Sequence, residues 1–92
     1  METKAIKFNV NNGKADMFVV VEFEKKFNTS HAINSIKEAT KKFNNSVMKD
    51  LKIYPKNLIA IELKDYLNEI CNVNITNVSI TNLKFNQMEM DM

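Results

Sequence analysis

The chain has 92 residues, of which 45% are hydrophobic and 26% are charged, and it carries a net charge of +2. This length and composition predict one domain, residues 1–92, with one modest core. The lone cysteine excludes a disulfide framework, and no apolar stretch approaches the roughly 18–20 residues that a membrane span needs. The first residues lack the pattern of a signal peptide, so we expect a cytoplasmic protein.

Residue usage is skewed towards amino acids with A/T-rich codons. The chain contains 14 Asn, 13 Lys and 9 Ile, but no Arg, one Gly and one Pro. The genetic code therefore points to an A/T-rich genome, such as those of many low-GC bacteria and their phages and plasmids. Such a bias also places Asn and Lys at positions where no chemistry requires them.

Residues 4–23 predict an N-terminal β-hairpin. Residues 4–10 alternate and place Ile6, Phe8 and Val10 on one face, and residues 15–23 form a second strand rich in Val and Phe. Between them, Asn12-Gly13 is a strong signal for a two-residue type I′ turn, in which both residues need positive φ. The cross-strand pairs that follow from this turn are Val10 with Ala15, Phe8 with Met17 and Ile6 with Val19.

The same register defines the other face of the hairpin. It places Phe18 opposite Lys7 and Val20 opposite Ala5, away from the apolar face of the first strand. Phe18 and Val20 are thus expected to leave an apolar spot outside the core, next to an unpaired strand edge. Such a spot suits a protein partner or a homodimer formed through the sheet.

Two amphipathic helices are expected after the hairpin. The first begins near the capping residues 28–30 and keeps apolar spacings of three and four until Asn44 and Asn45, which are suited to end it. Residues 47–54 fit either a short strand or a continued helix. After Pro55 a second helix runs from about 57 to 72, although its first turn is apolar enough for a strand. Its apolar side consists of Ile59, Leu63, Tyr66, Leu67, Ile70 and Cys71.

Residues 73–92 repeat with a period of five, in which the first and third positions are apolar. This pattern predicts one or two strands with a bulge near Asn77 or Asn82, where the alternation slips by one residue. The predicted fold class is therefore α+β. An N-terminal hairpin and two helices would pack on one face of an antiparallel sheet, in the order ββαβαβ or ββααβ.

Groups for catalysis or metal binding are scarce. Nucleophilic catalysis needs a nucleophile, a base and a group that orients the base, but His31 lies on a polar helix face and Cys71 on an apolar one. Zinc-ligand spacing is absent, the one glycine is assigned to the turn, and there is no arginine to clamp a phosphate. The alternating methionines of residues 88–92 are interpreted as strand or tail residues rather than copper ligands. We expect no enzyme activity, metal or cofactor.

Positive charge gathers in the middle of the chain. Residues 25–56 contain eight lysines and two acids, whereas residues 1–24 carry −1 and residues 57–92 carry −3. Such a surface can neutralise nucleic-acid phosphates, meet an acidic protein, or remain a solvated face. The lysines predicted to bind a partner or nucleic acid are Lys25, Lys26, Lys37, Lys41, Lys42, Lys49 and Lys52.

Small size, missing catalytic groups and polarised charge favour a non-enzymatic protein-binding module. We expect an inhibitor or regulator encoded by a phage or mobile element, of the counter-defence, anti-CRISPR type. The first alternative is a nucleic-acid-binding module without sequence specificity that uses the Lys-rich helix face. A small-ligand sponge or an accessory subunit is the second. No membrane partner is expected.

Overall fold

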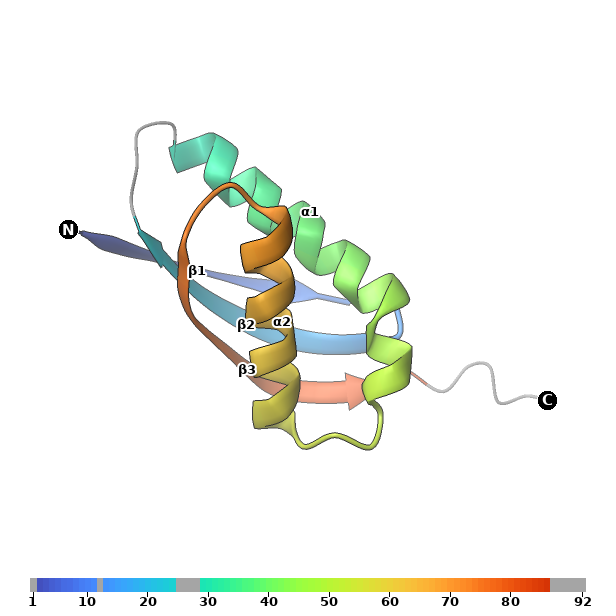
Figure 1. The fold of residues 1–92 in the computed structure, drawn as a ribbon. Coiled ribbons are helices and arrows are strands. Elements are labelled where there is room, and N and C mark those ends of the chain that lie inside the picture. Colours follow the sequence, from blue (N-terminus) through green and yellow to red (C-terminus); the bar gives the residue numbers. More distant parts are fainter. Residues whose placement is uncertain (1, 12, 25–28, 87–92) are drawn as a thin grey trace.

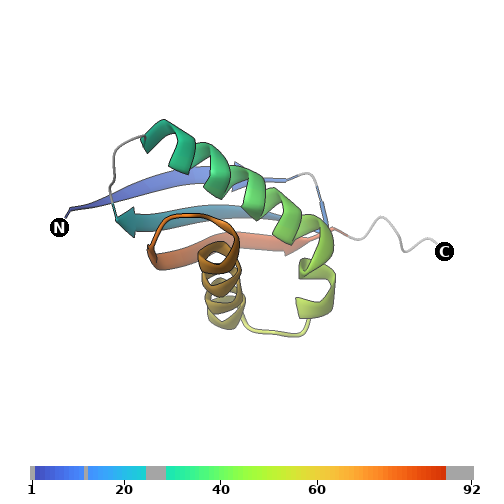
Figure 2. The same ribbon diagram turned by 45° about the horizontal axis from the view of Figure 1, so that its top comes forward.

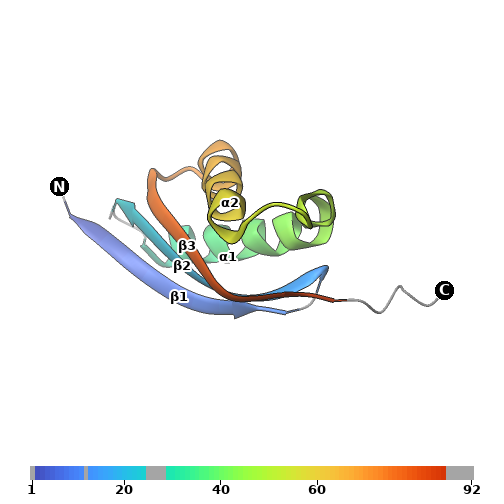
Figure 3. The same ribbon diagram turned by 90° about the horizontal axis from the view of Figure 1, so that it is seen from below.

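The computed structural model describes residues 2–11, 13–24 and 29–86. The three strands form an antiparallel sheet in the order β1-β2-β3, and both helices cover the same face of it (Figures 1 and 3). The predicted α+β class is confirmed, and the element order is ββααβ. The elements are β1 (Thr3–Val10), β2 (Ala15–Glu24), α1 (Thr29–Ser46), the 3₁₀ helix η1 (Met48–Leu51), α2 (Lys56–Ile70) and β3 (Ile75–Phe85).

The core lies between the central strand and the two helices. Along β2 every second residue is buried, as expected when one face of a strand packs against helices. In Figure 2, α1 runs along the sheet while α2 is seen nearly end-on, so the two helices cross. No described helix is long and apolar enough to cross a membrane. The fully buried large side chains include Val19, Val21, Phe23, Ile36, Phe43, Met48, Ile59, Leu63, Leu67 and Ile75.

The predicted register of the hairpin is wrong by two residues. Val10 pairs with Met17 rather than with Ala15, and the shift continues along both strands to Thr3 and Glu24. Because the shift is even, the same side chains still face the core. Ala15 pairs instead with β3, and on the core face of the hairpin Phe8 pairs with Val19 and Ile6 with Val21.

A buried asparagine of α1 explains this register. The Ala15 N–H donates to Asn44 Oδ1 at 3.1 Å, and Asn44 Nδ2 donates to the Ala15 carbonyl at 2.9 Å. These are the two bonds that an opposite residue of an antiparallel strand would make. The Asn44 amide therefore takes the place of the next β1 residue and ends the β1–β2 ladder at Val10. Sequence spacing predicted Asn44 only as a helix end, whereas α1 continues through it to Ser46.

Position 13 requires a glycine because α1 lies close to it, and not because the backbone there has a positive φ. The predicted positive φ is wrong for Gly13, and Asn12 lies outside the described residues. A Cβ placed on Gly13 would lie 2.7 Å from Asn44 Nδ2 and 3.0 Å from Asn44 Cγ. Asn44 cannot retreat without giving up its bonds to Ala15, so this position excludes a side chain.

We expect Gly13→Ala to lower the free energy of unfolding by about 1–3 kcal/mol, the usual cost of inserting an atom into a closely packed site. The cost should shrink in the Asn44→Ala background, because the opposing amide is then missing. Urea unfolding of the two single variants and the double variant measures this coupling. Strictly additive effects would contradict the contact as the cause.

The structure also decides the segments for which the sequence left alternatives open. Residues 47–54 contain no strand, because η1 and a turn lead into Pro55, and the first turn of α2 is helical. Ile70, which was expected on the apolar side of this helix, is 52% exposed at the last position of α2. The predicted bulge in β3 is confirmed at both places, since the pairing with β2 shifts near Asn77 and near Asn82. Asn82 has a φ of 53°, the left-handed conformation that Asn tolerates.

Candidate functional site

The two edges of the sheet differ in charge. β1 carries Lys4 and Lys7, and Lys37 of α1 lies over the ring of Phe8, with its Nζ 5.9 Å from the ring centroid. Lysines at an edge strand discourage pairing with another strand. At the other edge, residues 75–83 of β3 contain no charged side chain. The β3 edge is therefore the one open to an added strand.

An apolar groove runs beside this open edge. It has a volume of about 350 Å³ and lies between β3 and α2. Ile61 is 52% exposed although it is a large hydrophobic residue, and it forms part of the α2 wall. Two lysines and no acid line the groove. The lining residues are Lys56, Asn57, Ala60, Ile61 and Lys64 from α2 and Asn77, Val78, Ser79 and Ile80 from β3.

Backbone groups of β3 point into the space along the groove. The N–H and C=O of Ala15 point away from β3, towards Asn44. Because backbone groups point to alternate sides along a strand, the even-numbered residues of β2 direct their N–H and C=O towards β3. Val78 and Ile80 pair with odd-numbered residues of β2 and therefore direct their own N–H and C=O outward. Within the described part of the chain, no strand lies beyond β3.

The side-chain amide of Asn68 already bonds to the edge of β3 at one residue, Ile75. Its Oδ1 accepts from the Ile75 N–H at 2.9 Å, and its Nδ2 donates to the Ile75 carbonyl at 3.2 Å. This repeats the arrangement of Asn44 with Ala15, at the first residue of β3. The edge is thus closed by a side chain at Ile75, whereas the stretch at Val78 and Ile80 faces the groove.

The outer face of the sheet is the surface that Phe18 and Val20 were predicted to form. Both side chains lie on the face opposite the helices and are half-buried, and no described helix covers that face (Figure 3). The neighbours expected for them are wrong because of the register shift. Their observed strand partners, which are polar or charged, are Asn9 and Thr81 for Phe18, and Lys7 and Ser79 for Val20. Their role as an interface stays a prediction.

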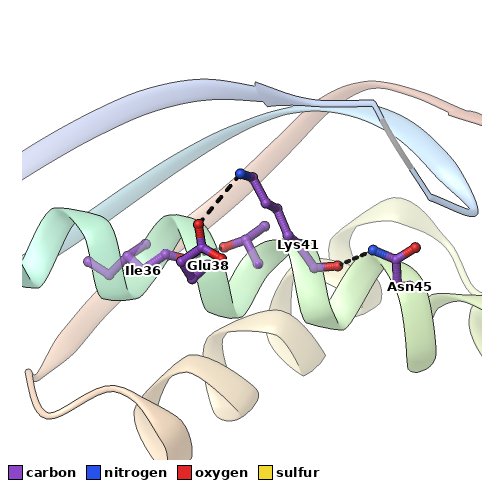
Figure 4. Close-up of polar contacts among 5 residues, drawn as sticks. Ile36, Glu38, Lys41 and Asn45 are labelled. Atoms are coloured by element: carbon purple, nitrogen blue, oxygen red, sulfur yellow. Dashed lines mark hydrogen bonds and ion pairs between the residues drawn. The ribbon is translucent and has the colours of Figure 1, made fainter.

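Five of the seven predicted lysines lie within the described residues, and their role in binding stays a prediction. Lys41 Nζ forms an ion pair with Glu38 Oε2 at 3.6 Å, and the backbone carbonyl of Lys41 accepts a hydrogen bond from Asn45 Nδ2 (Figure 4). Lys42 follows directly and so projects about 100° further round the helix. The remaining predicted lysines fall into three groups. Lys37 lies against β1, Lys49 and Lys52 are exposed in and after η1, and Lys25 and Lys26 lie outside the described residues.

An acidic cleft lies between the two helices on the other side of α2. Its volume is about 400 Å³, and Glu62, Asp65 and Glu69 line it with Tyr66 and Phe43. Among the described residues, no group of three or more His, Cys, Asp or Glu side chains could hold a metal ion. The three carboxylates lie on the exposed face of α2.

His31 and Cys71 occupy different environments. His31 is exposed in the first turns of α1, whereas Cys71 is buried after the end of α2. Burial removes water from the thiol and raises its pKa. A thiol with a raised pKa is protonated at neutral pH and is a poor nucleophile.

Comparison with family models, curated proteins and solved structures gives no match. The candidate site therefore depends on the geometry alone. The groove between α2 and β3 was missed at the sequence level, because it joins segments whose contact no local pattern reveals. One signal was present, namely the nine consecutive uncharged residues 75–83 in a chain in which 26% of residues are charged.

Proposed function

We propose that this chain is a non-enzymatic protein-binding module that docks its partner on the α2–β3 side. The observation that carries the proposal is the uncharged edge of β3 beside an apolar groove. Addition of a strand to such an edge is a recurring mode of peptide recognition, in which backbone bonds supply affinity and side-chain pockets supply specificity. Half-exposed Ile61 supplies an apolar contact of this kind.

An inhibitor or regulator is the role that best suits such a module. A small domain that covers one segment of a partner acts by occupying that segment, and it needs no catalytic group. The A/T-biased composition is what associates the module with phages and mobile elements, and a counter-defence role of the anti-CRISPR type is the form of inhibition that we propose. Among the predicted lysines, Lys37 and Lys41 already have neighbours in the fold. No observation therefore favours nucleic acid over protein.

The test uses two isoleucines of α2 with the same exposure. Ile61 and Ile70 are each 52% exposed, but only Ile61 lines the groove. We expect the wild-type chain and the Ile70→Gln variant to retain a stoichiometric protein from a low-GC bacterial lysate. The Ile61→Gln variant should lose it, because a polar side chain then lines the apolar wall.

A third variant separates the alternative function. Lys37→Glu combined with Lys41→Glu should leave the protein partner bound. Nucleic acid in place of a protein, released steeply by salt and by this double charge reversal, would contradict the proposal and support the nucleic-acid module. A partner retained equally by the Ile61→Gln and Ile70→Gln variants would place the binding surface elsewhere.

A further inference from the structure

We infer that the groove binds an extended acidic segment of a partner protein, which adds to β3 as a fourth strand. This inference rests on the proposed function and names the chemistry of the partner. Three features carry it: the outward backbone groups of β3, the apolar centre of the groove and the charge of its walls.

The backbone groups determine that the bound segment is extended. Val78 and Ile80 direct their N–H and C=O outward in the regularly paired part of β3, between the two bulges. A strand laid against them would extend the sheet by one member and satisfy both residues. A helix or a compact ligand offers no matching row of backbone donors and acceptors.

The side chains of the groove determine which residues of the segment face α2. A strand turns every second side chain to the same face. On the helix side these side chains would meet Ala60 and Ile61 near the middle of the groove, where an apolar residue fits. On the other side they would lie beside Ser79, which belongs to the outer face of the sheet.

The charge of the walls selects acids. Lys56 and Lys64 line the groove, and none of its lining residues is acidic. The two lysines are eight residues apart on α2, which corresponds to about 12 Å along the helix axis. This separation spans at most four residues of a strand. The expected recognition pattern therefore has two acids on the same face, two or four residues apart, with an apolar residue beside or between them.

A random octapeptide library displayed on phage tests the inference. Selected on the wild-type chain, the library should yield sequences with Asp or Glu at this spacing around an apolar residue. The Ile61→Gln variant should select none of them, whereas the Ile70→Gln variant should select the same set. Far-ultraviolet circular dichroism and a thermal unfolding curve for each variant confirm that it is folded.

Charge reversal supplies the decisive comparison. The double variant Lys56→Glu/Lys64→Glu should bind a selected acidic peptide about tenfold more weakly, because two attractive pairs become repulsive, and should select Lys or Arg at the same positions. The control Lys42→Glu/Lys49→Glu changes two exposed lysines elsewhere and should keep the acidic preference.

Three outcomes would overturn the inference. One is enrichment of neutral or basic peptides, and another is no enrichment at all. The third is a stable dimer of the chain alone in sedimentation equilibrium that Ile61→Gln dissociates, because a second copy would then be the occupant of the edge. The first two can occur while Ile61→Gln still abolishes capture of the lysate partner, and in that case the proposed function stands and only the chemistry of the occupant is wrong. The dimer would contradict both, because the edge would then be filled by a second copy of the chain.

Discussion

Replacing Asn44 by alanine should lower the free energy of unfolding by about 3–5 kcal/mol, one of the two largest effects expected of a single substitution in this chain. The Asn44 side chain is completely buried, and its amide bonds both the N–H and the C=O of Ala15. Alanine leaves both backbone groups buried without partners, at about 1–3 kcal/mol each. Urea denaturation monitored by circular dichroism measures the loss against the roughly 5–15 kcal/mol of a typical domain.

The neighbouring asparagine is a matched control. Asn45 Nδ2 donates to the Lys41 carbonyl, but this bond is exposed to water. Asn45→Ala should therefore change the free energy of unfolding by no more than about 0.5 kcal/mol. Equal effects at the two positions would contradict the role of Asn44 as a substitute strand residue.

If Asn44 bonds both backbone groups of Ala15, the stability of the variant Asn44→Asp should depend on pH. A carboxylate can accept from the Ala15 N–H but cannot donate to the Ala15 carbonyl, and its charge is buried. A protonated carboxyl can do both, so folding should raise the pKa of this group above its unfolded value of about 3.9. The folded variant then binds more protons than the unfolded one, and its stability should rise as the pH falls through the folded pKa. The gain should level off below about pH 3.9, and the wild type, whose residue 44 does not titrate, should lack it.

The sequence was informative wherever the structure depends on local periodicity. Alternation identified the core faces of β1 and β2, and spacings of three and four identified α1 and α2, because burial of one face imposes those periods. The slips near Asn77 and Asn82 were also visible, since a bulge interrupts an alternation. These features need no knowledge of what the segment packs against.

The register of the hairpin could not be derived in that way. Asn12-Gly13 is a strong turn signal when a hairpin is isolated. Here Asn44, 29 residues beyond Ala15 in the chain, competes for the backbone of Ala15 and determines where the ladder ends. The glycine is consistent with both explanations, because it tolerates positive φ and also leaves room for a neighbour. Only the tertiary contact distinguishes them.

The candidate groove shows the same limit for function. The sequence predicted only that the first turn of the second helix, which contains Ile61, is apolar enough for a strand, and its charge pattern favoured the lysines of residues 25–56. The groove becomes visible only when α2 lies beside β3, which brings Lys56 and Lys64 next to an uncharged strand. Lys56 belonged to the basic stretch and Lys64 did not, so net charge by segment could not have grouped them.

The second large effect is expected at the contact between the helices. Phe43 of α1 is completely buried and meets Tyr66 of α2 edge to face, with ring centroids 5.3 Å apart and an interplanar angle of 63°. Phe43→Ala should lower the free energy of unfolding by about 3–5 kcal/mol, through lost burial and the cavity left behind. At about 4–8 °C per kcal/mol, the thermal midpoint should fall by roughly 20 °C. The control Tyr66→Phe keeps the ring pair and should move the midpoint by only a few degrees.

Phe43→Ala also separates stability from binding. Phe43 holds α2 on the side of α1, whereas the groove lies on the side of β3, where buried Ile59, Leu63 and Leu67 still anchor the helix to the core. Well below its lowered midpoint, the variant should therefore bind a peptide selected by the wild type with nearly unchanged affinity. Ile61→Gln should show the reverse, a midpoint close to that of the wild type and no binding, because its side chain is half-exposed and lines the groove. If Phe43→Ala lost the peptide while still folded, the binding surface would have to include the cleft between the helices, and the acids of that cleft would then favour a basic partner rather than an acidic one.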